Sequence, residues 1–201
     1  MAVVSEVSIC NQALTALGAN TIISLDDDTT EAKLCKTHYA PLRDAVIEAH
    51  NWTFATTWVN LAKAADPELS EFANAFPIPA DVVRVIFVGE DYDHPNVAWQ
   101  VQGNSVVTKD TTCKCQVIKI VTDPNKFSPL FVQALAARLS ADMAVAITSS
   151  RSLFELHMQV YGVKIKEAAS TDGMQGKARR IRSRWLERSR SQGPLGAGPY
   201  V

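Results

Sequence analysis

The chain has 201 residues, of which 47% are hydrophobic and 20% charged, as is typical of one globular domain with or without an appendage. No run approaches the roughly 18 uninterrupted apolar residues that predict a membrane span, and the N-terminus lacks the basic and apolar regions of a signal peptide. The four cysteines therefore indicate free thiols in a reducing compartment.

The net charge of −1 hides a strong asymmetry along the chain. Residues 177–190 contain seven basic residues and a single acid, Glu187, whereas the remainder contains thirteen basic and twenty acidic residues. An acidic body with a basic end favours contact with a polyanion.

Two amphipathic helices are predicted first, over 5–18 and 29–50. The first has an apolar face at helical spacing and ends at Gly18, a natural C-terminal cap. Asp28, with Glu31 three residues later, predicts a capping box for the second, and Pro41 is expected to bend or split it. Two apolar stripes define these faces: Cys10, Ala13, Leu14 and Leu17, then Cys35, Tyr39, Leu42, Val46 and Ala49.

Short β-branched runs between 82 and 121 predict a small, mostly antiparallel sheet of three or four strands. Gly103 and Asn104 are expected to form a hairpin turn between two of them. The stretch "FPIPAD" before the sheet should be extended, and the second helix is expected to end near "AHNWTFATTW".

Helices return over 129–148 and 152–170. Ser128 is expected to cap the third helix with Pro129 at its first position. Residues 130–147 are apolar on nearly every face, which predicts a central core helix or one buried in an interface. Ser152 with Glu155 resembles a capping box, and Leu153, Leu156, Val160 and Val163 form the apolar stripe of the fourth helix.

These elements predict an α+β fold, a bundle of about four main helices with a small sheet inserted between the helix pairs. Residues 1–176 form the body, and 177–201 are a basic C-terminal arm whose Gly- and Pro-rich end is extended.

Candidate chemical sites are few. Cys113 and Cys115 would share one face of a strand, but zinc needs two more ligands, and only His94 is near in sequence, so structural thiols are favoured. His38, His50 and His157 stand in no recognisable nucleophile motif. We therefore expect no enzymatic activity and no cofactor.

Three features permit both a structural and an interaction role. Arg138 and Asp142 are spaced to pair on one helix face, either as a half-buried structural ion pair or as an intersubunit contact. The aromatic residues of "NWTFATTW" lack interleaved basic residues, which favours core packing over base stacking. The arginines of 177–190 with Trp185 have the composition of a phosphate-contacting segment, although a solvated basic end would look the same.

The order of these segments resembles a known family. "NQALTALGANTIISLDDDTTEAKLCKTHYAPLRDAVIEAHNWTFA" is similar to the opening of the bacteriophage tail tubular protein A family, with its L-G helix end, Arg43-Asp44 pair and W-x-F-A close. "FPIPADVVRVIFV" resembles the entry into that family's sheet, and the two later helices resemble those of phage adaptors. The resemblance covers about residues 5–176.

The resemblance implies a structural virion protein of the phage neck, present in the host cytoplasm during assembly. Such a head-to-tail adaptor forms a ring, dodecameric in the family, between the portal protein and the tail nozzle protein, with DNA passing through the lumen. A free subunit is then expected to expose apolar surface, as over 130–147, for heterologous contacts.

The arm is the segment expected to dock on the portal, with arginines and Trp185 as anchors and transient contact with transiting DNA possible. The alternative is a nucleic-acid-binding module that uses the same basic segment. The residues expected in portal docking are Arg179, Arg180, Arg182, Arg184, Trp185, Arg188, Arg190, Pro194, Leu195, Pro199, Tyr200 and Val201.

Overall fold

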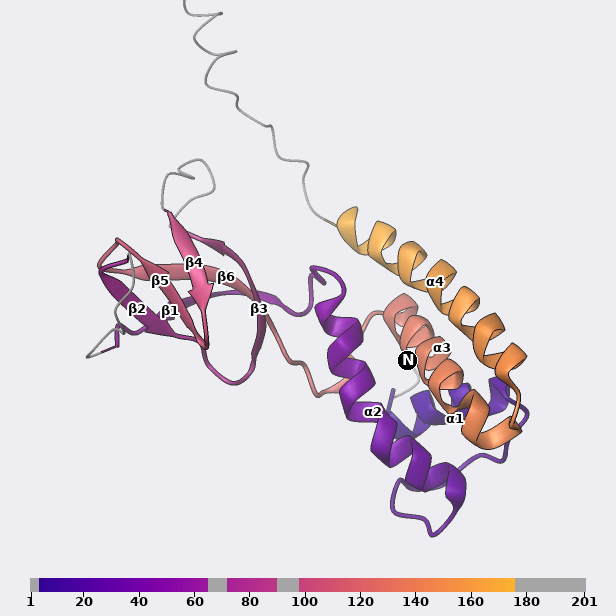
Figure 1. Ribbon diagram of the computed structural model, residues 1–201. Coiled ribbons are helices and arrows are strands. Elements are labelled where there is room, and N and C mark those ends of the chain that lie inside the picture. Colours follow the sequence, from indigo (N-terminus) through magenta and orange to yellow (C-terminus); the bar gives the residue numbers. More distant parts are fainter. Residues whose placement is uncertain (1–3, 65–71, 90–97, 176–201) are drawn as a thin grey trace, which may run out of the picture.

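The computed structural model describes residues 4–64, 72–89 and 98–175. They form four α-helices and two antiparallel three-stranded sheets, so the predicted α+β class is confirmed. Figure 1 shows the helices gathered in one bundle and the strands in a second body beside it. The predicted arm, 177–201, lies outside the described residues.

Helix α1 (Glu6–Ala16) begins at a reciprocal cap that the sequence pattern did not reveal. The Ser5 hydroxyl accepts from the Ser8 amide at 3.1 Å, and the Ser8 hydroxyl accepts from the Ser5 amide at 2.9 Å. At the other end Gly18 adopts φ +70°, which lets the Ala19 amide return to the Leu14 carbonyl at 3.0 Å. The expected glycine cap is confirmed.

Helix α2 (Thr30–Glu48) starts one residue later than predicted. Thr29 is the N-cap and accepts from the Ala32 amide at 3.2 Å, while Asp28 pairs with Lys33 at 2.5 Å. The helix is continuous through Pro41, contrary to the expected split. Pro41 and the residue four positions earlier, Thr37, are exposed, so water can satisfy the carbonyl that proline leaves without a donor.

Helices α3 (Pro129–Thr148) and α4 (Arg151–Gly173) form an antiparallel hairpin. Ser128 caps α3 as predicted, accepting from the Phe131 amide at 3.2 Å. The cap of α4 is Ser150 and not Ser152. Ser149 turns the chain in a left-handed conformation with φ 55°, and the next residue, Ser150, accepts from the Leu153 amide at 3.4 Å.

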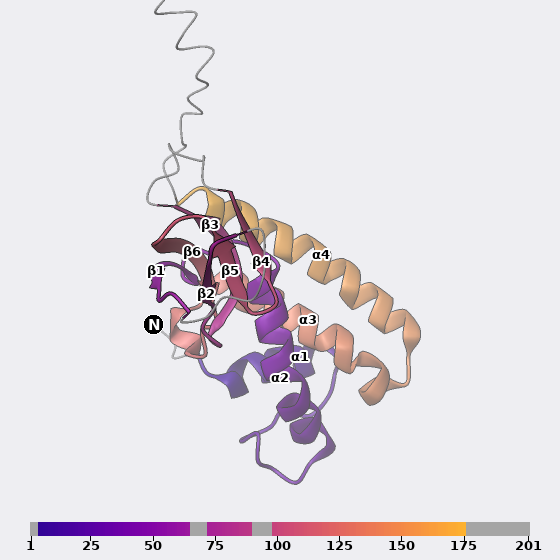
Figure 2. The same ribbon diagram turned by 60° about the vertical axis from the view of Figure 1, so that its left-hand side comes forward.

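Helix α3 is central to the bundle, between α1, α2 and α4 (Figure 2). Among the described helices it alone is long and apolar enough to cross a membrane, but most of it is buried in the core, and core helices of soluble folds share that composition. The expectation that 130–147 would leave apolar surface exposed is therefore wrong for most of α3, since its own chain covers it.

The β body is larger than the predicted sheet of 82–121. Its first sheet has the order β1-β6-β3 and its second the order β2-β5-β4, all antiparallel. Gly103, with φ 55°, lies in the β4–β5 hairpin turn, as predicted. The strands are β1 (Thr56–Leu61), β2 (Asn74–Pro77), β3 (Val82–Val88), β4 (Trp99–Gln102), β5 (Ser105–Thr108) and β6 (Cys113–Lys119).

Strand β6 joins two hydrophobic cores. Val117 faces the core between the two sheets, whereas its neighbour Ile118 is buried in the helical core. This follows from the alternation of side chains along a strand. The Lys119 amide donates to the Ala55 carbonyl at 2.9 Å, so the chain leaves the β body beside the point where it entered, before the 3-10 turn Pro124–Lys126 leads to α3.

Candidate interaction surfaces

The residues expected to dock on the portal all lie in 177–201, outside the described residues. The structure does place the residues that precede this segment. The end of α4 is attached to the junction between α2 and β1 through Asp172, which is 5% exposed. Its Oδ2 accepts from the Thr53 amide at 2.8 Å and from the Thr53 hydroxyl at 3.0 Å, with His50 Nε2 at 3.9 Å.

The sequence did not predict a role for Asp172, because its hydrogen-bond partner Thr53 is 119 residues away and belongs to no motif. The only available signal was an acid at a core-facing helical position, since Asp172 follows Tyr161, Ile165 and Ala168 at helical spacing. The consequence of this contact is that α4 ends at a defined place on the body.

Arg138 and Asp142 pair within α3 at 3.4 Å, as their spacing predicted. The pair is half-buried, and Arg138 also reaches α4, where its guanidinium lies 5.5 Å from the centre of the Tyr161 ring and Nη1 is 3.3 Å from Met158 Sδ. These contacts tie α3 to α4 within one chain. They give the pair a structural role, and an additional contact between subunits stays a prediction.

The aromatic stretch divides between the two bodies. Trp52 is fully buried, donates from Nε1 to the Val46 carbonyl at 2.9 Å, and packs edge-on against Phe131. Phe54 joins the same helical core. Trp58 differs from the prediction: it is 39% exposed in β1, with Lys114 Nζ 5.6 Å from its ring. The basic partner that the local sequence lacked comes from the neighbouring strand.

The cysteines form two buried pairs. Cys113 and Cys115 face the core between the sheets, and the contact with the Cys115 thiol, together with burial, raises the pKa of Cys113. The contact with Cys35, together with burial, likewise raises the pKa of Cys10 in the helical core. In 4–64, 72–89 and 98–175 no three metal-ligating side chains cluster, and all four cysteines are free thiols.

The histidines lie apart from one another. His50 is near Asp172, and His157 Nδ1 is 3.1 Å from the Ser140 hydroxyl between α4 and α3. His38 is half-buried in α2, and His94 lies outside the described residues. Ser140 also donates to the Ala137 carbonyl at 2.8 Å, so the Ser140–His157 pair serves the helix contact.

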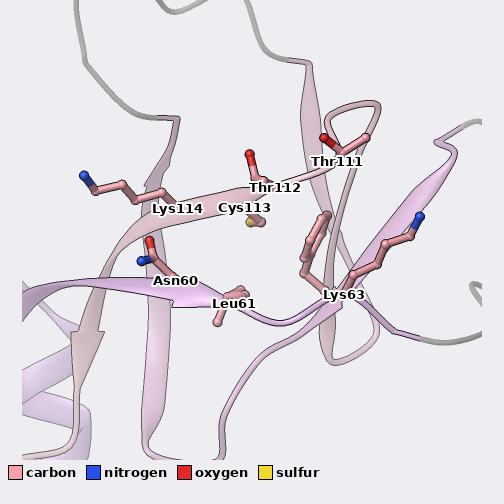
Figure 3. Close-up of a pocket in the computed structure, with 8 residues that line it drawn as sticks. Asn60, Leu61, Lys63, Thr111, Thr112, Cys113 and Lys114 are labelled. Carbon is pink, nitrogen blue, oxygen red and sulfur yellow. The ribbon is translucent and has the colours of Figure 1, made fainter.

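A cavity of about 420 Å³ opens at one end of the β body (Figure 3). Figure 3 shows the ammonium groups of Lys63 and Lys114 pointing away from each other, and Lys114 lies over Trp58. The charges therefore do not converge on a common ligand position. The lining residues are Asn60, Leu61, Lys63, Phe76, Thr111, Thr112, Cys113 and Lys114.

The apolar stripe predicted for α4 faces outward. Leu156 is 52% exposed, Val160 36% and Val163 67%. The core side of α4 is instead built by Tyr161, Ile165, Ala168, Ala169 and the carboxylate of Asp172. Helix α4 therefore has one face for its own core and a second, apolar face that is exposed among the described residues.

A second exposed apolar residue projects from the connection between α1 and α2. Ile23 is 92% exposed, although its neighbour Ile22 is buried. Neither this residue nor the outward direction of the α4 stripe was predicted. A 3.6-residue repeat shows that a helix is apolar on one side but not which neighbour lies there.

No protein-family model matches the chain, and no curated protein matches it.

Proposed function

We propose that this chain is a structural head-to-tail adaptor of a bacteriophage virion, a non-enzymatic ring subunit between the portal protein and the tail nozzle protein. The proposal rests on the ordered resemblance of residues 5–176 to the tail tubular protein A family. It is in keeping with an α+β chain whose β body is inserted between two helix pairs.

The observation that carries the proposal beyond resemblance is the second apolar face of α4. Soluble monomers bury most large apolar stripes, and contiguous exposed ones mark interaction sites. Leu156, Val160 and Val163 recur at one-turn spacing along the outside of the longest helix. A ring subunit needs such surfaces on two different sides, because its contacts are heterologous.

The direct test is assembly with the portal. The full chain, mixed with the portal protein of the same phage, is expected to form rings on the portal that electron microscopy resolves. Removal of 177–201 should weaken docking while circular dichroism and the unfolding midpoint of the body stay unchanged. A full-length chain that stays monomeric beside the portal would refute the proposal.

A nucleic-acid-binding module is the second candidate, favoured by the seven basic residues of 177–190. Binding through up to seven phosphates predicts a log–log salt slope near −6 on duplex DNA, from about −0.9 per contact. The matched variant replaces Arg179, Arg180, Arg182 and Arg184 with glutamine. A flat salt response of the full chain would exclude this function.

A further inference from the structure

The four cysteines of the chain are buried as two pairs of facing thiols. Cys10 of α1 and Cys35 of α2 are fully buried in the helical core, and their thiols are hydrogen-bonded to each other. Cys113 and Cys115 form the same kind of pair in the core between the sheets. Cysteine packs as a small apolar residue without a partner of its own kind, so both pairs are candidates for redox chemistry.

Helices α1 and α2 are in register around the first pair. Ala13 and Ala32, both fully buried, lie one turn from the two cysteines on the same helix faces. Their small side chains let the helices come close, because the separation of packed helices depends on the side chains at the contact. One turn in the other direction, Glu6 interacts electrostatically with Tyr39. The two thiols therefore meet from separate backbones that already pack together.

The second pair is held apart by its strand. Cys113 and Cys115 lie two residues apart on β6, with both side chains on one face. The rise of a strand places their Cβ atoms about 6.6 Å apart, whereas a disulfide needs Cβ atoms about 3.5–4.5 Å apart. Strand β6 is paired on both sides, with β1 and β3, so its backbone is not free to shorten this distance. The pair in the helical core is not subject to this fixed spacing.

We propose that Cys10 and Cys35 are a redox pair that closes to a disulfide between α1 and α2 under oxidising conditions, while Cys113 and Cys115 stay thiols. The pair keeps its two thiols in a reducing compartment, and disulfides persist outside one. The bond therefore forms after the chain leaves the conditions in which it folds. This inference goes beyond the proposed function and does not depend on it.

Hydrogen peroxide balances the reaction and is small enough to enter during a local opening of the bundle. The thiolate of one cysteine attacks an oxygen of the peroxide, so that an S–O bond forms, the O–O bond breaks, and hydroxide leaves and takes up the proton of that thiol. The second thiol attacks the sulfenic acid, and the S–S bond forms as the S–O bond breaks and a second water leaves. The two thiols lose two electrons and two protons, and the peroxide is reduced to two waters.

The bond should stabilise the helical bundle, because it closes a loop of about 25 residues that contains the connection between α1 and α2. The melting temperature of the oxidised chain should rise by about 6–12 °C. Dithiothreitol should remove this gain, since it reduces the disulfide and leaves other oxidation products in place.

A tryptic map identifies the bridge directly, because each cysteine lies on a tryptic peptide of its own. The full chain is freed of reductant, shown by circular dichroism to be folded, and treated overnight with hydrogen peroxide. It is then unfolded, alkylated and digested. The expected product is peptide 1–33 linked to peptide 34–36, with peptides 110–114 and 115–119 both alkylated.

Two outcomes overturn the proposal. The first is recovery of peptides 1–33 and 34–36 with both cysteines alkylated. The second is a bridge between peptides 110–114 and 115–119, which would show that access through the cavity lined by Cys113 (Figure 3), and not backbone spacing, selects the pair.

Two variants check the effect on stability, each compared in its own oxidised and reduced forms so that any folding cost of the substitution cancels. Cys113→Ala should keep the bridge and the gain in melting temperature. Cys10→Ala should lose both. A gain in oxidised Cys10→Ala equal to that of the unaltered chain would refute a link between α1 and α2 as its cause.

Discussion

Replacing Asp172 with alanine should loosen the end of α4 from the rest of the body. The substitution removes the acceptor of two hydrogen bonds, from the Thr53 amide at 2.8 Å and from the Thr53 hydroxyl at 3.0 Å. It also removes the negative charge near His50 Nε2, at 3.9 Å. No other described side chain replaces this acceptor at Thr53.

The expected loss of stability follows from the burial of Asp172 and the exposure of its partner Thr53. A hydrogen bond to a charged group contributes about 1.5–3 kcal/mol when both partners are withdrawn from water. Asp172 is 5% exposed, but Thr53 is on the surface, so water can reach its freed donors. We therefore expect a loss of about 2 kcal/mol in the free energy of unfolding, rather than the sum of two full bonds. Asp172→Asn keeps an acceptor and should lose about half as much.

Urea denaturation followed by circular dichroism measures this loss, and the melting temperature should fall by about 4–8 °C for a chain of this size. Glu167→Ala is the matched control, since Glu167 is an exposed acid on the same helix. A double-mutant cycle with Thr53→Val should give a coupling energy of about 1 kcal/mol. If Asp172→Ala lies within about 0.5 kcal/mol of the unaltered chain, the contact does not hold α4 in place.

Four further measurements test the cores. Tyr39→Phe should raise stability by up to about 1 kcal/mol, because the buried Tyr39 hydroxyl has no hydrogen-bond partner among the described residues. Burial also raises the pKa of Tyr39, so the folded state loses stability as the pH rises above about 10, where the tyrosine of the unfolded chain ionises first. Tyr39→Phe should therefore flatten an alkaline stability profile. Trp52→Phe should lose about 2 kcal/mol in denaturant titrations, through a smaller ring and the lost bond to the Val46 carbonyl; an unchanged midpoint would contradict its central position. A thiol reagent should modify none of the four cysteines in the native state and all four in denaturant, and rapid native labelling would show that a core is open.

Apolar periodicity predicted all four helices, but residue type at the helix starts did not fix their first residues. Ser128 and Gly18 were identified because a proline at the first helical position and a glycine at the end restrict the alternatives. Asp28 and Thr29 are both good N-caps, as are Ser150 and Ser152, so residue type alone cannot choose between them. The capping box of α1 uses Ser8 in place of the usual glutamate.

Strand β1 and the orientation of α4 depended on distant parts of the chain. Strand β1 follows α2 after a short turn, and its partner β6 comes some fifty residues later, so "TTWVNL" had no neighbouring run to pair with. The sequence predicted that the α4 stripe is apolar but not which neighbour it faces. The core side contains Tyr161 and Asp172, whose polar groups conceal it from a pattern of hydrophobicity.

The surfaces of α4 and Ile23 could not be assigned from one chain for the same reason. A residue is exposed or buried by what its neighbours leave uncovered, and the neighbours of Ile23 are fixed by side-chain contacts from Asn11 and Asp27. Neither contact has a sequence pattern from which the exposure of Ile23 could be predicted.

The hydrogen bond between the Lys119 amide and the Ala55 carbonyl shows that the β body is an insertion whose two ends lie side by side at the helical bundle. Insertions of this kind can lengthen, shorten or change their outer strands while the bundle keeps its own packing, because the distance that the chain must bridge stays fixed. Related chains could therefore vary the part that reaches outward and conserve the part that the helices build. Ile118 and Ile86 limit that freedom, since these two strand residues pack in the helical core and must be retained whatever replaces the rest.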